Sequence, residues 1–164
     1  MFTERIIHPL KPVYDENSRI LILGSFPSVK SRETLFYYGH KQNRFWKLVS
    51  ELLNQNVPET NKEKEEFLLR NHIALWDVVK SCEIKGSSDS SIRDVIPNDL
   101  NIILDKADIK QIYVNGKKAE ELYKKFCLNM TKREAKVLPS TSPANAVYTM
   151  EKLKEEWKDI LEYL

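Results

Sequence analysis

Two parts of this sequence carry side chains suited to binding a flat, polar ligand. The segment Gly24-Ser25-Phe26-Pro27-Ser28 follows an apolar run and supplies small hydroxyls, an aromatic ring and a rigid proline. Asn43 lies about fifteen residues later, and its carboxamide can both donate and accept hydrogen bonds without carrying charge. This combination suits a neutral, hydrogen-bonding ring such as a nucleobase.

A second polar loop, Pro139-Ser140-Thr141-Ser142-Pro143, lies near the end of the chain. We expect Ser142 to cap the last helix, with Pro143 at its first position, because proline is favoured there. The free amides at such a helix start attract phosphate. Asn145 follows two residues later. Lys117 opens another expected helix, where an external anion would offset its unfavourable interaction with the helix dipole, and the alternative is a solvated surface position.

The elements that position these loops follow from the hydrophobic pattern. Strands alternate with helices, which indicates an α/β fold with a mostly parallel sheet between helix layers. Right-handed crossovers then place the loops after all four strands on one rim of the sheet. The expected strands are 19–23, 73–76, 111–114 and 136–138, and the expected helices are 43–53, 60–71, 98–104, 117–130 and a tail that starts near 142. The polar stretch 80–94 lacks periodicity and is expected to be a long loop, which is often functional.

Length and composition indicate one domain, residues 1–164, of a globular protein with 41% hydrophobic and 30% charged residues. A net charge of +2 excludes a uniformly polybasic nucleic-acid binder, although bases concentrate in 28–48 and 106–136. The two cysteines form no C-x-x-C pair, and no His/Cys spacing typical of a metal site is present. No signal peptide or apolar run of membrane length is visible, so we expect a cytoplasmic, monomeric protein without membrane contact.

Five segments in order resemble the uracil-DNA glycosylase superfamily, and within it the hypoxanthine-DNA glycosylase branch. They are the loop 24–28, Tyr37–Trp46, Leu75–Val78, Asn115–Ala119 and Leu138–Ala146, so the resemblance covers most of the chain. It implies a three-layer α/β/α sandwich around a four-stranded parallel sheet. It also implies hydrolysis of the N-glycosidic bond of a deaminated base after the base is flipped out of DNA. Resemblance to the hypoxanthine branch implies that this base is hypoxanthine. No metal or organic cofactor is implied, and the partner is DNA containing the deaminated base.

The resemblance also implies roles for single residues, each beside a simpler structural one. Asn43 would position the attacking water, and it can equally be a helix N-cap. Phe26 would stack on the flipped base, and the alternative is a core phenylalanine beside the first strand. Asp77 would read the base edge with Ser25 nearby, and it can equally be a cap or an ion-pair partner. Contacts with the DNA backbone are expected from Ser28, Ser140, Ser142, Pro143, Asn145 and Lys117.

Alternative functions stay open at this point. The first keeps the reaction but changes the base to uracil, or to one recognised in a mismatch. A catalytically silent module that binds DNA or nucleotides is the second, although the chain has no G-x-G-x-x-G or P-loop motif. A serine hydrolase using Ser25 and His40 is the weakest, because the G-x-S-x-G elbow is missing.

Overall fold

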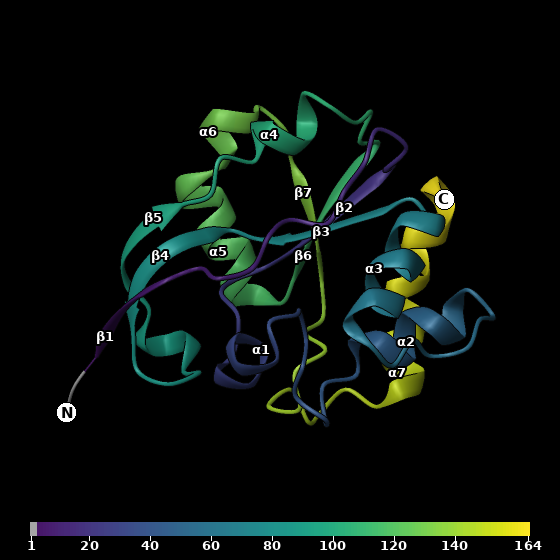
Figure 1. The fold of residues 1–164 in the computed structure, drawn as a ribbon, viewed down its shortest axis with the longest axis horizontal. Helices are drawn as coiled ribbons and strands as arrows, with labels where there is room; N and C mark the ends of the chain where they lie inside the picture. The colour runs from purple at the N-terminus through teal and green to yellow at the C-terminus, as the bar shows by residue number, and fades with distance from the viewer. Residues whose placement is uncertain (1–2) are drawn as a thin grey trace.

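The computed structural model describes residues 3–164 and contains a central parallel sheet between helices (Figure 1). The sheet has the order β3-β2-β6-β7. All of its strand pairs are parallel, as the sequence predicts for a fully covered sheet. Its strands are β2 (Ile20–Gly24), β3 (Ile73–Asp77), β6 (Gln111–Asn115) and β7 (Ala135–Leu138).

The two central strands are apolar because helices cover both of their faces. Ile22 lies opposite Leu75 on one side and Tyr113 on the other, and all three are fully buried. In Figure 1, α2, α3 and α7 lie together on one face of the sheet, and α5 lies on the other. This arrangement confirms the predicted three-layer α/β/α sandwich. The helices are α1 (Val29–Thr34), α2 (Phe45–Leu52), α3 (Asn61–Arg70), α4 (Asn101–Leu104), α5 (Lys117–Phe126), α6 (Leu128–Thr131) and α7 (Met150–Trp157), with 3₁₀ turns at Asp89–Ser91 and Lys158–Tyr163.

Two helix predictions were nearly correct. The predicted capping box at the start of α3 is present, because the Thr60 side chain accepts from the Glu63 N–H at 3.1 Å. The expected helix 117–130 is instead divided into α5 and α6 at Cys127. A further short helix, α1, lies inside the segment expected to be a loop and is capped by Ser28.

The start expected for the last helix was wrong. Its first residue is Met150 rather than Pro143, and its cap is Thr149 rather than Ser142. Thr149 accepts from the Lys152 N–H at 3.2 Å, whereas residues 142–148 form turns. The Ser-Pro pair therefore shapes a loop instead of opening a helix.

A second, antiparallel sheet was not predicted. It has the order β1-β4-β5 and is formed by β1 (Glu4–Ile7), β4 (Val79–Ile84) and β5 (Arg93–Pro97). The stretch 80–94 is thus largely a β-hairpin rather than a loop. Register shifts between β4 and β5 interrupt the period-two pattern, and β5 is mostly exposed, so neither strand has a clear hydrophobic signature.

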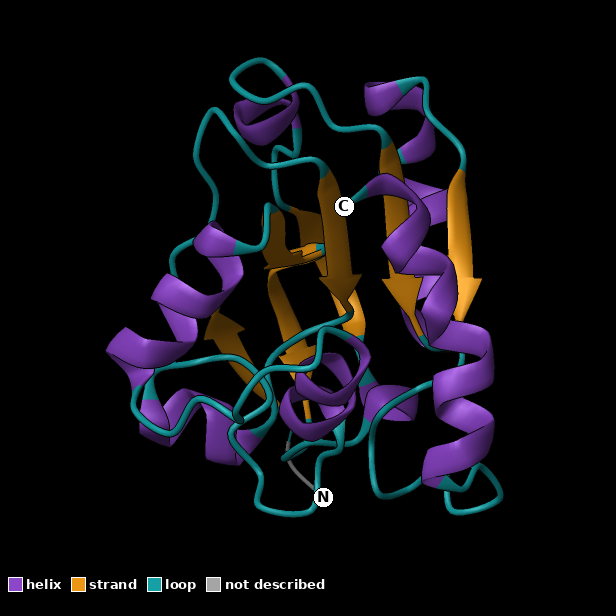
Figure 2. Cartoon of the chain, turned by 90° about the vertical axis from the view of Figure 1, so that its right-hand side faces the viewer, coloured by secondary structure: helices purple, strands orange, loops and turns teal. Residues whose placement is uncertain are grey.

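The strands of the parallel sheet end at one edge, where the connecting loops gather (Figure 2). The turn after β3 is very short, since only Val78 separates β3 from β4. The two sheets therefore meet at Asp77, the last residue of β3. None of the helices within residues 3–164 has the length and apolarity needed to cross a membrane.

Candidate active site

A cavity of about 300 Å³ lies at the carboxyl edge of the parallel sheet. The carboxyl ends of β2, β3 and β6 and the loops after β2 and β7 line it, as the predicted topology requires, and the connection between β4 and β5 adds Ser87 and Asp89. The cavity brings together Phe26, Asn43, Asp77 and Ser142, the four residues on which the interpretation of the sequence depends. Ser25, Ser28, Ser140 and Pro143 also line it.

Phe26 forms one wall of the cavity and is only 8% exposed. The His8 ring packs against it edge-on, with centroids 5.9 Å apart. The guanidinium of Arg32 lies 5.8 Å from the ring centroid. Phe26 is therefore a core residue and a wall of the cavity at once, so its two interpretations are compatible.

Asn43 is held by a network that joins three of the lining segments. Its Oδ1 accepts from the backbone N–H of Phe45 at 3.0 Å, across the N-cap residue Arg44, so Asn43 lies one residue before the N-cap position expected for it. The same oxygen accepts from the Thr141 hydroxyl at 2.9 Å. Thr141 is held in turn by Asn115, which donates from Nδ2 to Thr141 Oγ1 and accepts the Thr141 N–H, each at 3.1 Å.

This network fixes which end of the Asn43 carboxamide is free. Both acceptor positions of Oδ1 are used by donors from Phe45 and Thr141. Nδ2 has no hydrogen-bond partner among residues 3–164, although Asn43 lines the cavity. The group that Asn43 can offer to a ligand or water is therefore its N–H donor.

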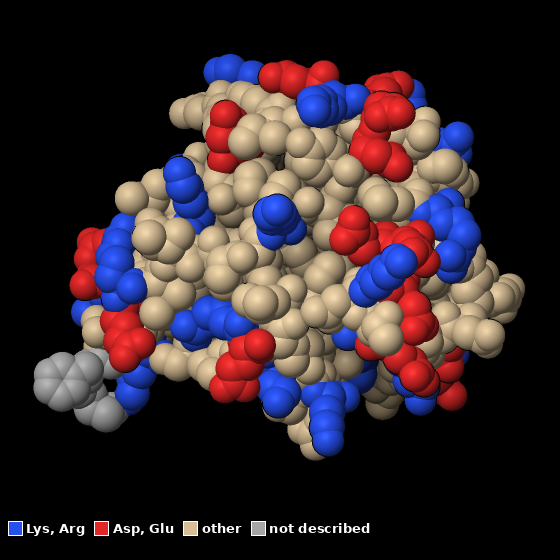
Figure 3. All heavy atoms as spheres, in the orientation of Figure 1, with Lys and Arg blue, Asp and Glu red and all other residues tan. Residues whose placement is uncertain are grey.

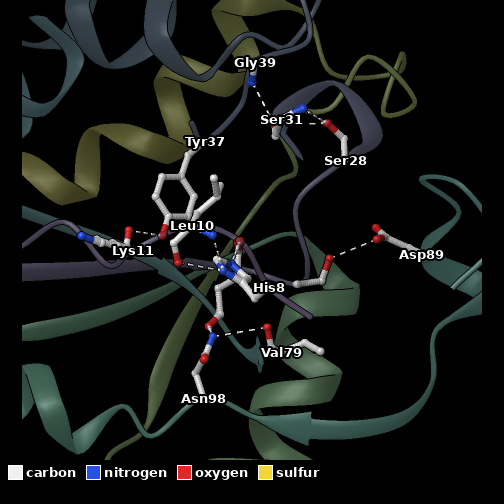
Figure 4. Close-up of polar contacts among 12 residues, drawn as sticks. His8, Leu10, Lys11, Ser28, Ser31, Tyr37, Gly39, Val79, Asp89 and Asn98 are labelled. Carbon is white, nitrogen blue, oxygen red and sulfur yellow. Dashed lines mark hydrogen bonds and ion pairs between the residues drawn. The ribbon is translucent and has the colours of Figure 1, made fainter. Parts of the chain in front are cut away.

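Asp77 lies at the floor of the cavity and is 3% exposed. Its Oδ2 accepts from His8 Nε2 at 2.8 Å, so this oxygen has a structural partner, and the contact is an ion pair when the imidazole is protonated. Its Oδ1 receives no hydrogen bond from the described chain. Figure 4 shows His8 at the centre of this polar cluster, next to Leu10 and Tyr37.

Gly24 leaves the space that the Asp77 carboxylate occupies. A Cβ at this position would stand 2.4 Å from Asp77 Oδ1 and 3.2 Å from the Tyr38 hydroxyl. The Tyr38 hydroxyl is buried and lacks a hydrogen-bond partner within residues 3–164. Burial, and then the negative charge of Asp77, raise the pKa of both Tyr37 and Tyr38, so these phenols stay protonated. A Tyr38 O–H donor therefore lies near the Asp77 acceptor.

Asp89 lines the cavity on the side of the β4–β5 hairpin. It accepts from the Ser25 hydroxyl at 3.0 Å (Figure 4). Burial raises the pKa of the Asp89 carboxyl, while the Ser25 hydrogen bond and the charge of Lys118 act in the opposite direction. The Ser25 hydroxyl predicted to face a base is thus engaged with the hairpin.

The serines of the other loops make mostly local hydrogen bonds. Ser28 caps α1 by accepting from the Ser31 N–H at 3.1 Å, and its own hydroxyl donates to Ser31 Oγ. Ser140 accepts from the Ser142 N–H at 3.1 Å, and Ser142 accepts from the Ala144 N–H at 3.2 Å. The hydroxyl protons of Ser140 and Ser142 have no acceptor within the described chain and are available to an external ligand.

Arg44 ties the loop after β7 to the start of α2. Its guanidinium donates to the backbone carbonyl oxygens of Ser142 at 3.0 Å and Asn145 at 3.1 Å, and also to that of Tyr148. The backbone N–H of Arg44 donates to the Thr141 carbonyl at 3.1 Å. Arg44 has no carboxylate partner among residues 3–164, so its charge is balanced by main-chain dipoles.

The model of the uracil DNA glycosylase superfamily matches residues 11–164, nearly the whole chain. This chain belongs to the uracil DNA glycosylase superfamily. Among curated proteins, the hypoxanthine DNA glycosylase of Methanosarcina barkeri is 40% identical over 136 residues, which is 82% of this chain and 85% of that protein. The hypoxanthine DNA glycosylase of Methanosarcina acetivorans is 39% identical over 153 residues, or 92% and 95% of the two chains.

A solved structure agrees with this assignment. The solution NMR structure of a candidate uracil DNA glycosylase from Methanosarcina acetivorans superposes with a TM-score of 0.77 at 38% identity. The match covers 94% of this chain and 96% of the other. The fold of this superfamily member is therefore shared over almost its full length.

Two predicted contact residues lie outside the cavity lining. Lys117 is exposed at the first position of α5 and has no ion-pair partner in the described chain. Asn145 is bound to the loop itself, because its Nδ2 donates to the Ser140 carbonyl at 3.0 Å. In Figure 3, several Lys and Arg side chains lie along the lower margin of the visible face, with Asp and Glu side chains among them.

Interpretation of the sequence missed His8, Tyr37, Tyr38, Asp89 and Thr141 as parts of the site or its support. Both tyrosines and Thr141 fall in segments that carry the family resemblance. The resemblance therefore pointed to these segments but did not indicate what the three residues do. Asp89 falls in the stretch expected to be functional because of its length. Nothing in the sequence near His8 indicates its contact with Asp77, since 69 residues separate them. Residues 3–164 contain no cluster of three or more side chains able to hold a metal ion.

Proposed function

We propose that this protein is a monofunctional DNA glycosylase that hydrolyses the N-glycosidic bond of hypoxanthine in deoxyinosine. The observation that carries the proposal is the convergence of Phe26, Asn43 and Asp77 in one cavity of about 300 Å³, at the lower end of the usual size of a ligand site. The names of the two Methanosarcina relatives support the choice of hypoxanthine. The catalytic unit is one domain, 1–164, because strands of both sheets contribute to the same hydrophobic core.

The cavity recognises the base by stacking and by hydrogen bonds. Phe26 stacks on the flipped ring, a contact worth about 1–3 kcal/mol per base, which offsets part of the cost of unstacking it. Asp77 Oδ1 accepts from a ring N–H of the base. Ser25 supports this side of the slot through its hydrogen bond to Asp89.

Bond cleavage separates charge, because the departing base takes the bonding electrons and the sugar becomes cationic. The Asn43 N–H donor holds the attacking water by its oxygen, and Thr141 fixes the carboxamide in this orientation. Placement is the main requirement, since the sugar cation reacts readily with a correctly positioned water. Oxygen of the water bonds to C1′ of the sugar, and its proton leaves to the base or to solvent.

The DNA backbone contacts the rim of the cavity. Ser140 and Ser142 have free hydroxyl protons for phosphate oxygens, and Pro143 shapes their loop. Lys117 supplies an unpaired positive charge near this rim. Ser28 and Asn145 act by holding the loops that carry these groups, because their own side chains are engaged.

The proposed setting is the cytoplasm, with the protein acting as a monomer on DNA. The buried thiols of Cys82 and Cys127 are both free, as expected in a reducing compartment. Size-exclusion chromatography with light scattering tests the monomer, and a larger particle at micromolar concentration contradicts it.

Labelled duplexes that carry a single deoxyinosine or deoxyuridine test the activity. The protein is incubated with each duplex, and abasic sites are then cleaved with alkali. Strand breaks at deoxyinosine after alkali support the proposal, and breaks at deoxyuridine alone support a uracil glycosylase instead. Binding without breaks indicates a silent module, and breaks that need no alkali contradict hydrolysis by water alone.

A further inference from the structure

His8 is buried although it lies at the end of an exposed strand. Its side chain is 2% exposed, whereas the neighbouring Ile7 is 71% exposed. It precedes residue 11, where the match to the family model begins, and it is not part of the cavity lining. A polar ring in such a place needs partners for both of its nitrogens.

Both nitrogens of His8 have hydrogen-bond partners. Nε2 lies 2.8 Å from Asp77 Oδ2, and Nδ1 lies 3.2 Å from the N–H and 3.0 Å from the carbonyl oxygen of Leu10 (Figure 4). The neutral ring accepts the Leu10 N–H, whereas the imidazolium donates to the Leu10 carbonyl. Because an ionised carboxylate only accepts hydrogen bonds, Nε2 carries a hydrogen and donates it to Asp77 in either of these forms.

The His8 ring also fixes the geometry of the cavity floor. Because Oδ2 of Asp77 accepts from His8, the carboxylate is held with Oδ1 on the side of Gly24, where only the absence of a Cβ leaves room for it. The same ring packs edge-on against Phe26 and lies 6.1 Å from Tyr37. One side chain outside the cavity therefore positions both the acceptor and the aromatic wall.

We infer that His8 is a positioning residue that sets base specificity by holding Asp77 Oδ1 toward the ring N–H of the base. Hypoxanthine has a hydrogen on N1, which Oδ1 accepts. Adenine has a lone pair at N1, which the same oxygen repels. The inference rests on the proposed function, because it concerns the base bound in that site.

Single-turnover rates on two duplexes test the role of His8. One duplex carries deoxyinosine and the other carries deoxynebularine, whose purine lacks both the N1 hydrogen and the O6 atom. The rate on deoxyinosine divided by the rate on deoxynebularine measures recognition of the N1 and O6 edge of the base. A general loss of activity lowers both rates and leaves this ratio unchanged. His8→Phe keeps an aromatic ring against Phe26 but removes the donor, and His8→Gln restores a donor near the position of Nε2.

The ratio for His8→Phe is expected to fall about 10- to 100-fold, as for loss of one charge-assisted hydrogen bond. His8→Gln is expected to recover most of the ratio. His72→Gln is the matched control, since this histidine lies before β3, and its Nδ1 contacts the Asn17 carbonyl at 3.1 Å. Its ratio is expected to equal that of the unchanged protein.

An unchanged ratio in a folded His8→Phe protein overturns the inference, even where both rates fall equally. If that variant does not fold, as judged by circular dichroism, His8→Asn takes its place, because its shorter amide does not reach Asp77. An unchanged ratio in His8→Asn overturns the inference in the same way. Failure of the unchanged protein to release hypoxanthine is a different result and refutes the proposed function itself.

Discussion

The hydroxyl of Thr141 is the central group of the network that holds Asn43, and its removal tests that network. Thr141 is fully buried, donates to Asn43 Oδ1 and accepts from Asn115 Nδ2. Thr141→Val keeps the shape of the side chain but leaves one acceptor and one donor without this partner. Each unmet group costs about 1–3 kcal/mol, and water from the adjoining cavity keeps both near the lower limit.

The expected loss of stability is therefore about 2 kcal/mol, which lowers Tm by about 4–8 °C in a chain of this size. Thermal denaturation followed by circular dichroism measures this change. The single-turnover rate on deoxyinosine is expected to fall about tenfold or more, because Asn43 then retains only its bond to the Phe45 N–H. Thr141→Ser keeps the hydroxyl and is expected to retain most of both properties. A Thr141→Val protein with unchanged Tm and rate refutes the network as a source of stability and of orientation.

Three further predictions concern other parts of the site. Asn43→Asp keeps the acceptor but removes the free N–H donor, so the rate of hypoxanthine release should fall about 10²–10³-fold. A rate within tenfold of the original would mean that the side-chain oxygen, and not the N–H, positions the water. Arg44→Lys cannot reach three carbonyl oxygens at once, and a loss of about 2 kcal/mol in the free energy of unfolding is expected in urea titrations; equal stability contradicts the role of the guanidinium. The raised pKa of Asp89 means that the folded state favours the protonated carboxyl, so stability present at low pH is lost as pH rises through the raised value. Asp89→Asn keeps the acceptor for Ser25 and should raise Tm at pH 7 more than at pH 4, and a gain independent of pH contradicts the assignment.

The parallel sheet could be predicted because its strands are buried on both faces. In a small α/β protein, a continuous apolar run such as Ile20–Leu23 can be buried in few places other than a strand covered on both faces. The convergence of Ser25, Asp77 and Ser142 then followed from the rule that parallel strands end at the same edge, whereas the place of Asn43 in the site came from the family resemblance. The prediction succeeded where a local pattern and a general rule of topology act together.

The antiparallel sheet and its contribution to the site could not be predicted in the same way. Register shifts in β4 and the exposure of β1 and β5 remove the alternation on which a strand prediction depends. The burial of His8 results from a contact across 69 residues, so no window of the sequence contains it. The start of α7 was misjudged because the Ser-Pro signal is local, whereas Arg44 holds those residues in turns from another element.

The way in which Arg44 binds the loop after β7 has a consequence for how this region can change over evolution. The guanidinium contacts only main-chain oxygens, which every amino acid supplies. The exposed residues Ala144, Ala146 and Val147 can therefore exchange their side chains, and with them the surface offered to a DNA strand, without losing the anchor. Among descendants of this protein, changes in substrate preference are expected to accumulate at these positions of the loop after β7, while Arg44 is retained.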